Sequence, residues 1–193
     1  MDNMNNAAYA MTEDQEDYEV INGQVYMMAR PNTNHMTVEG NIFTAFKIYL
    51  KGKNCRPFNE TDVFFDDDNN FVPDVMIVCN PNIIKYKGIF GTPDLVVEIL
   101  SPSTALNDKM SKFFAYERYG VKEYWIVSPR EKSVEVYLLK DGRFERDGFY
   151  QFYTEEEYND LTEKQKAAAK REIKVSLYDD LYVTLDDIFD GIE

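Results

Sequence analysis

The sequence predicts an α+β fold, in the broad sense that includes mixed α/β, with one central mixed sheet flanked by helices and an N-terminal β-hairpin. Three observations lead to this class: short apolar segments that alternate with a period of two, longer segments with apolar residues at helical spacing, and a 44% hydrophobic composition. The length of 193 residues fits one domain of ordinary size. We expect residues 1–17 to form a flexible N-terminal arm and residues 18–193 to form a single domain.

The predicted strands are bounded by turn residues. Residues 18–30 indicate a β-hairpin about Asn22 and Gly23, because this pair suits the positive φ angles of a type I′ turn. Beyond the hairpin, the predicted strands are residues 61–66, 71–79, 95–100, 121–128, 133–139 and 173–177.

The predicted helices combine apolar spacing with capping residues. They are residues 34–50, a segment that begins with a cap at Asn107 or Asp108 and stops at Gly120, a solvated helix at 155–172, and a terminal helical turn at 185–189. On the first helix, His35 and Glu39 lie four positions apart and therefore share one flank. On the second, Lys112 and Tyr116 are related in the same way.

Charge and cysteine content limit the functions that the chain can have. The 35 acidic and 21 basic residues give a net charge of −14, which is a poor general match to a polyanion. A role on nucleic acid would need a local basic patch, a bound divalent metal, or both. Cys55 and Cys79 lie in no metal-binding pattern, and we expect two free thiols. The first residues lack the pattern of a signal peptide and no apolar run reaches about 18 residues, so we expect a cytoplasmic protein without a membrane segment.

Four acidic residues lie in or beside apolar segments rather than in charged runs: Glu39, Asp74, Asp94 and Glu98. Two carboxylates about 4 Å apart repel by roughly 4 kcal/mol at an effective dielectric near 20. Their convergence therefore requires a proton, a basic partner or a metal, and carboxylate oxygens suit Mg²⁺ or Mn²⁺. An ordinary role stays open for each one taken alone, such as a strand-entry residue or the partner of a nearby lysine.

Lys112 is the best-placed cation for such a site. It follows the strand that carries Glu98, and one helical turn lets its side chain reach back toward the end of that strand. An ammonium there can orient an attacking water, help to deprotonate it, and balance charge at a phosphodiester. The alternative is an ordinary charge on the helix surface.

The segments FVPDVMIV, TPDLVVEILSPST and YGVKEYWIVSP, taken in order and with Asp108, Lys112 and Tyr116, resemble the Uma-type family of restriction endonucleases. This family is a branch of the PD-(D/E)XK nuclease superfamily, and the similarity extends from about Tyr18 to Leu139. The resemblance implies a sheet flanked by helices, an acidic metal site at its edge, and magnesium-dependent hydrolysis of DNA phosphodiester bonds.

The resemblance also implies roles for individual residues. Asp74 and Glu98 match the two strand acids that hold the metal with Glu39 of the first helix, and Asp94 matches a second, supporting acid. A lysine is expected two residues after Glu98, but Leu100 stands there. The resemblance suggests that Lys112 fills this place from the following helix.

Three further residues have supporting roles in this hypothesis: His35, Asp108 and Tyr116. His35 would contact the phosphate or a water on the metal, and its alternative is a helix-start histidine bonded to a backbone group.

Two other functions stay open at this point. The chain could be a catalytically silent relative that serves as a binding or dimerisation module, or a metal-dependent phosphodiesterase with a small substrate. DNA is the expected partner, and a homodimer would let two sites address two strands. The presence of Asp74, Glu98 and a usable lysine favours an active enzyme.

Overall fold

The computed structural model describes residues 18–28, 30–101 and 107–192, with residues 107–110 described by their backbone alone. The predicted N-terminal arm, residues 1–17, lies outside these ranges. Among the described residues, no helix has both the length and the apolar character needed to cross a membrane.

The larger part of the core is organised by a six-stranded sheet. Its strand order is β12-β11-β10-β9-β6-β3, in which β9 and β10 are parallel and the other neighbours are antiparallel. The strands are β3 (Arg56–Asn59), β6 (Val75–Val78), β9 (Leu95–Ile99), β10 (Glu123–Ser128), β11 (Ser133–Lys140) and β12 (Arg143–Gln151). The polar strand β12 was not predicted, because its sequence, RFERDGFYQ, lacks a regular apolar alternation.

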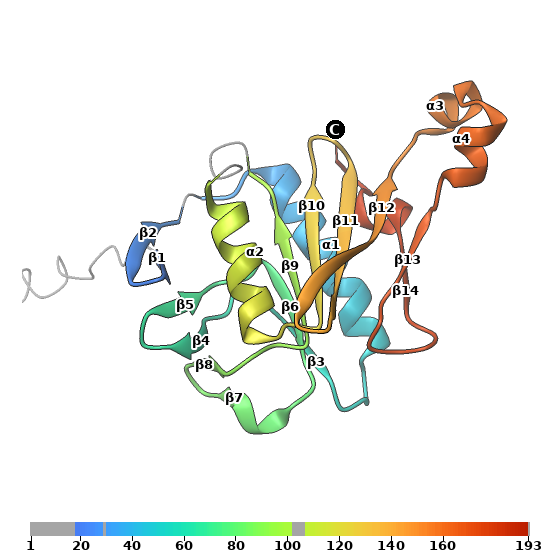
Figure 1. The fold of residues 1–193 in the computed structure, drawn as a ribbon. Helices are drawn as coiled ribbons and strands as arrows, with labels where there is room; N and C mark the ends of the chain where they lie inside the picture. The colour runs from blue at the N-terminus through green and yellow to red at the C-terminus, as the bar shows by residue number, and fades with distance from the viewer. Residues whose placement is uncertain (1–17, 29, 102–106, 193) are drawn as a thin grey trace, which may run out of the picture.

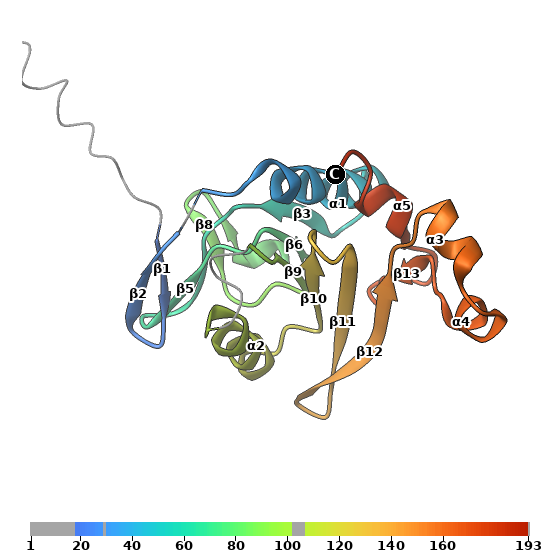
Figure 2. The same cartoon turned by 90° about the horizontal axis from the view of Figure 1, so that it is seen from above.

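Two helices cover opposite faces of this sheet, as Figure 2 shows: α1 (Thr33–Tyr49) on one face and α2 (Asn107–Tyr119) on the other. Successive strand residues point to opposite faces, and the core divides accordingly. On β9, Val97 packs in the cluster that contains the apolar face of α1, whereas Val96 packs in the cluster that contains Tyr116 of α2. Glu98 has the same parity as Val96 and therefore faces α2.

A second six-stranded sheet lies beside the first and contains the predicted hairpin (Figure 1). Asn22 and Gly23 both have positive φ, which confirms the predicted turn. The predicted strand at 71–79 is divided between the two sheets, because Pro73 has no N–H to continue a ladder. The strand order is β2 (Gln24–Met27), β1 (Tyr18–Ile21), β5 (Asn69–Phe71), β4 (Val63–Asp66), β8 (Gly88–Phe90) and β7 (Ile84–Lys85), with a 3-10 turn, η1 (Pro81–Ile83), before β7.

The C-terminal part differs from the expectation of one long helix at 155–172. Two short helices, α3 (Glu155–Asp160) and α4 (Glu163–Ala168), project from the body of the protein in Figure 1. The single-helix prediction was wrong because Thr154 and Thr162 each form a complete capping box, so the second one begins a new helix. The chain then forms β13 (Glu172–Lys174), β14 (Tyr182–Thr184) and α5 (Leu185–Ile188).

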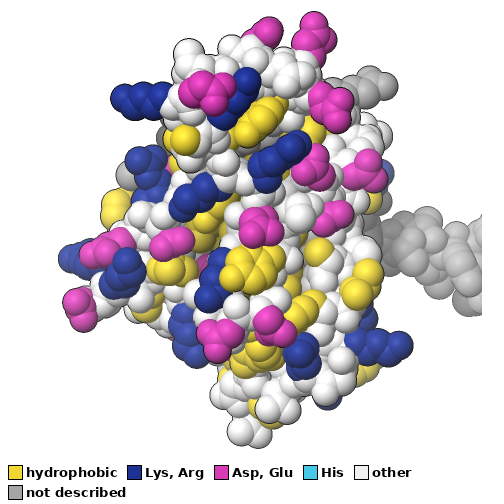
Figure 3. All heavy atoms as spheres, turned by 90° about the vertical axis from the view of Figure 1, so that its right-hand side faces the viewer, with side chains coloured by type: hydrophobic (Ala, Val, Ile, Leu, Met, Phe, Trp, Pro, Cys, Tyr) yellow, Lys and Arg dark blue, Asp and Glu magenta, His cyan; other side chains and the backbone are white. Residues whose placement is uncertain are grey.

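The side of the molecule toward which these helices project carries both signs of charge. In Figure 3, which faces this side, Lys and Arg side chains are interspersed with Asp and Glu and with apolar groups. Single-sign basic surfaces are the usual electrostatic feature of nucleic-acid binding, and this face does not have one.

The cysteines also differ from the expectation, because Cys55 and Cys79 form a disulfide. The prediction of free thiols was wrong for a topological reason. Arg56 of β3 pairs with Val78 of β6 in an antiparallel register. Cys55, which precedes Arg56, therefore lies opposite Cys79, which follows Val78. Their Cα atoms are 3.9 Å apart, although 24 positions separate them in the sequence.

Helix α2 is fixed to β12 by the carboxylate of Glu117. The backbone N–H of Phe144 donates to this carboxylate at 2.7 Å, and the guanidinium of Arg143 donates at 2.8 Å. These contacts, the Phe144 hydrogen bond first, lower the pKa of Glu117 below its ordinary value. The ionised form is therefore favoured in the folded protein.

We expect Glu117→Gln to lower the free energy of unfolding by about 1 kcal/mol at pH 7, since a charge-assisted hydrogen bond becomes a neutral one. In the folded state the pKa of Glu117 lies below its ordinary value of 4.5. The contribution of the ionised carboxylate to the free energy of unfolding is therefore present above pH 4.5 and is lost as the pH falls through the folded-state pKa. Urea denaturation of parent and variant at several pH values measures this difference. Glu131→Gln is the control, because its carboxylate is 70% exposed. A difference in the free energy of unfolding between parent and Glu117→Gln that grows below pH 4.5 would contradict the lowered pKa of Glu117.

Candidate active site

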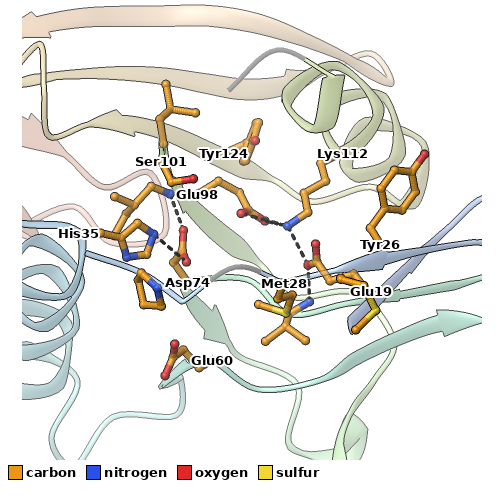
Figure 4. Close-up of a pocket in the computed structure, with 15 residues that line it drawn as sticks. Glu19, Tyr26, Met28, His35, Glu60, Asp74, Glu98, Ser101, Lys112 and Tyr124 are labelled. Carbon is orange, nitrogen blue, oxygen red and sulfur yellow. Dashed lines mark hydrogen bonds and ion pairs between the residues drawn. The ribbon is translucent and has the colours of Figure 1, made fainter. Parts of the chain in front are cut away.

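A cavity of about 110 Å³ opens where β6 begins and β9 ends, between α1, α2 and the β1–β2 hairpin (Figure 4). Val75 pairs with Val97 in the antiparallel register of β6 and β9. Continuing that register by one residue places Asp74 across from Glu98 at the cavity. The residues that line the cavity are Glu19, Tyr26, Met27, Met28, Pro31, His35, Glu60, Val72, Asp74, Glu98, Ile99, Leu100, Ser101, Lys112 and Tyr124.

Lys112 reaches across from α2 to the carboxylate of Glu98. Its Nζ lies 3.2 Å from both Glu98 oxygens, and the hydroxyl of Tyr116, one turn further along α2, donates to Glu98 Oε1 at 2.6 Å. Leu100, at the position where the resemblance expects a lysine, lines the cavity and packs against the apolar cluster beneath α2. The ammonium therefore comes to Glu98 from the helix and not from the strand.

Asp74 is held between α1 and the end of β9. Its Oδ1 lies 3.3 Å from Nε2 of His35, and its Oδ2 accepts a hydrogen bond from the backbone N–H of Ile99. Burial lowers the pKa of His35, but the hydrogen bond and charge of Asp74, together with the charge of Glu39, raise it above its ordinary value. The predicted strand acid and the predicted helix histidine thus form one contact.

Glu39 lies beside this pair. His35, Glu39 and Asp74 each offer one atom that could bind a metal, and these three atoms all lie within 4.8 Å of one another. Asn59 donates to Glu39 Oε1 at 2.8 Å, and burial raises the pKa of Glu39. Nδ1 of His35 is buried and has no hydrogen-bond partner among the described residues. Two carboxylates and an imidazole therefore converge with unused ligand capacity.

The electrostatics of the cavity are unusual because several acids share one ammonium. Burial raises the pKa of Glu98 to about 8, and Asp74 and Glu19 act in the same direction against the opposing charge of Lys112. Burial alone would lower the pKa of Lys112, but Glu98 and Glu19 raise it above its ordinary value. Lys112 therefore stays charged at neutral pH, whereas Glu98 takes up a proton more readily than an ordinary carboxylate.

Glu19, on β1, is a member of this site that the sequence reasoning missed. Its Oε1 lies 2.7 Å from Nζ of Lys112 and accepts a hydrogen bond from the backbone N–H of Val72 at 2.8 Å. The signal in the sequence was weak. Glu19 shares a strand face with Ile21, and both are buried, so an acid occupies an inward position of the hairpin.

Two predicted supporting acids have other places in the structure. Asp94 lies before β9, at the end opposite Glu98, where its carboxylate accepts from the backbone N–H of Cys79 and from Lys122, each at 2.7 Å. The structure does not bring it to the cavity. The backbone of Asp108 lies in α2, and its side chain is outside the described part of the chain.

Known proteins resemble this chain in sequence and in fold. The family model described as "Uma2: Putative restriction endonuclease" matches residues 6–171. The chain belongs to the Uma2 family. A Synechocystis protein named "Uncharacterized protein slr1290" is 31% identical over 129 residues, which cover 65% of this chain and 68% of that protein. The crystal structure of "a putative nuclease belonging to DUF820" from Anabaena variabilis has a TM-score of 0.69, with 20% identity and 94% of each chain covered.

The fold is therefore that of a restriction-endonuclease-like protein, as predicted, and the predicted family is confirmed. Membership of the Uma2 family supports a nuclease-like role. The Anabaena structure, at 20% identity, contributes the likeness of fold.

We expect Lys112→Met to lower the free energy of unfolding by about 3 kcal/mol, because removing one partner of a buried ionic group leaves the other charges uncompensated. Chemical denaturation at pH 7 measures the loss. Lys122→Met is the matched control, since the side chain of Lys122 is 65% exposed and its pairing with Asp94 is screened by solvent. Equal losses in the two variants would contradict the described environment of Lys112.

Proposed function

We propose that this Uma2 protein is a divalent-metal-dependent endonuclease that hydrolyses DNA phosphodiester bonds. One observation carries the proposal. Asp74 and Glu98 meet across β6 and β9 at one cavity, and the charged Nζ of Lys112 lies 3.2 Å from both oxygens of Glu98. This set contains two acids that can hold a cation and a hydrogen-bond donor beside them.

The residues present fit a divalent cation. The cavity and its edge hold the carboxylates of Glu19, Glu39, Glu60, Asp74 and Glu98, against the one ammonium of Lys112 among the described lining residues. The raised pKa of Glu98 indicates that added positive charge would be stabilising. In our proposal, Asp74 and Glu98 hold the ion, with Glu39 beside it. Such oxygen ligands suit Mg²⁺, and a neighbouring imidazole is compatible with Mn²⁺.

Asp74 and Glu98 would hold a cation that, when bound, would supply a Lewis acid at the scissile phosphate and lower the pKa of a water. Lys112 donates hydrogen bonds to that water or to a phosphate oxygen and stabilises the charge that develops there. Because its pKa is raised, Lys112 acts as a donor and not as the base that removes a proton. Tyr116 orients Glu98 through its hydroxyl, and His35 orients Asp74 through Nε2.

A second candidate is a metal-dependent phosphodiesterase with a small substrate. The net charge of −14 and the cavity volume of about 110 Å³ favour it, since both disfavour a long polyanion more than a small phosphodiester. The third alternative, a silent module of the same fold, predicts neither cation binding nor hydrolysis. The two experiments below separate these three functions.

Mn²⁺ should stabilise the parent protein by about 2.7 kcal/mol when its concentration is 100 times the dissociation constant, because a ligand bound only by the folded state stabilises by mass action. Thermal denaturation with and without Mn²⁺ measures the shift. Glu98→Gln should remove most of the shift, whereas Glu117→Gln, whose carboxylate is bound to Arg143 and Phe144, should keep it. No shift in the parent would contradict the metal site.

Supercoiled plasmid should be cut by the parent protein in Mg²⁺ or Mn²⁺. Asp74→Asn and Glu98→Gln each lose a carboxylate that would hold the cation, and Lys112→Met loses the ammonium that stabilises charge at the phosphate, so each should lower the rate about 100-fold or more. Glu117→Gln should cut at the parent rate. A Mn²⁺-stabilised parent that leaves plasmid intact but hydrolyses bis(p-nitrophenyl) phosphate would favour the small-substrate candidate. Absence of both activities would reject hydrolysis under those conditions.

A further inference from the structure

We propose that Glu19, from the N-terminal hairpin, is a positioning residue that holds the ammonium of Lys112 in place for phosphodiester hydrolysis. The inference rests on the proposed function and goes beyond it, since it assigns a role in the reaction to a residue on a different sheet from Glu98. In Figure 4, Lys112 lies between Glu98 and Glu19, with a contact to each.

The contact with Glu19 is the shorter one. Oε1 of Glu19 lies 2.7 Å from Nζ of Lys112, whereas each oxygen of Glu98 lies 3.2 Å away. Both partners are largely removed from water, with 8% of the Glu19 side chain and 10% of the Lys112 side chain exposed. A charge-assisted hydrogen bond in such a place is stronger than one at the surface.

Glu19 is itself held in position. The backbone N–H of Val72 donates to the same oxygen that contacts Lys112. The hairpin is tied to the neighbouring turn by the pairing of Val20 with Asn70 and by hydrogen bonds from the backbone N–H groups of Asn22 and Gly23. The carboxylate is thus preorganised, and it does not rely on the lysine for its own orientation.

Lys112 needs a second partner because Glu98 has two roles in the proposed reaction, which are to hold the cation and to accept hydrogen bonds from Lys112. In the proposed reaction Glu98 holds the cation, and a carboxylate shared with a cation is a weaker partner for an ammonium. Oε1 of Glu19 already contacts Nζ of Lys112 and accepts from the backbone N–H of Val72, and in our proposal Glu19 does not hold the cation. It therefore keeps Lys112 near Glu98 without competing for the metal.

A Glu19 variant could also lose activity only because the protein becomes less stable, and the chain offers a matched control for that effect. Glu117 also accepts one backbone N–H, from Phe144, and one cation, from Arg143, at 2.7 and 2.8 Å. Its carboxylate lines no part of the cavity. Glu117→Gln and Glu19→Gln therefore remove the same kind of interaction, and only the second one touches Lys112.

The experiment compares plasmid cleavage by the parent, Glu19→Asp, Glu19→Gln and Glu117→Gln in Mn²⁺. Glu19→Gln should lower kcat by about 10- to 100-fold, the range for a misplaced catalytic group, with KM and Mn²⁺ affinity nearly unchanged. Glu19→Asp should recover part of kcat, because it retains the charge. Glu117→Gln should keep the parent kcat. A parent-like kcat in Glu19→Gln, or an equal loss in Glu117→Gln, would overturn the proposal.

A second measurement does not depend on cleavage. Acetylation by acetic anhydride, followed by mass spectrometry, reports how firmly each lysine is held. The rate at Lys112 should rise about tenfold in Glu19→Gln, as expected for loss of a charge-assisted hydrogen bond, while the rate at Lys122 stays constant. If the parent cuts nothing, the proposed function fails, and this measurement alone decides whether Glu19 positions Lys112. An unchanged acetylation rate at Lys112 in Glu19→Gln would overturn the proposal that Glu19 holds Lys112 in place.

Discussion

The buried ammonium of Lys112 is the charge on which the arrangement of this site depends. It lies between Glu98 and Glu19, which belong to different sheets, and it comes from a third element, α2. Without it, these carboxylates and Asp74 would face one another in a poorly solvated cavity, where like charges repel strongly. Burial raises the pKa of Glu98, and Asp74 and Glu19 add to this effect because one positive charge does not compensate three acids. A site in this state has a physical reason to bind a further cation.

Backbone geometry decides which acids share the cavity. Val75 pairs with Val97, so Asp74 and Glu98 meet at one end of β6 and β9, although 24 positions separate them. Asp94 has the same parity as Glu98 but lies four residues away, which at about 3.3 Å per residue is some 13 Å along the strand. Sequence spacing favours Asp94 as the partner of Glu98, whereas the register selects Asp74. The polar ends of two buried strands thus become the site, and the apolar residues between them form the core.

Sequence reasoning succeeded where the signal was local. The hairpin turn, both large helices and the strand acids each have a pattern within a few residues, and the ordered motifs around Asp74 and Glu98 indicated the family. It failed where the decisive neighbour is distant. Glu19 contacts Lys112 across 93 positions, and Cys55 meets Cys79 through strand register. The division of residues 155–172 was a different failure, since Thr162 supplied a capping signal that was outweighed by the helix-forming composition around it.

In our proposal, Lys112 of α2 takes the role of a lysine on β9, and this explains why the site needs additional support. A lysine at position 100 would be placed by β9 itself, since the backbone that carries Glu98 would carry it too. Leu100 instead lines the cavity and packs against the apolar cluster beneath α2, and the ammonium arrives on a long side chain from a helix. Its position then depends on a partner at the far end of the side chain. Glu19 is that partner, so a buried acid on an otherwise peripheral hairpin is the physical counterpart of the missing strand lysine.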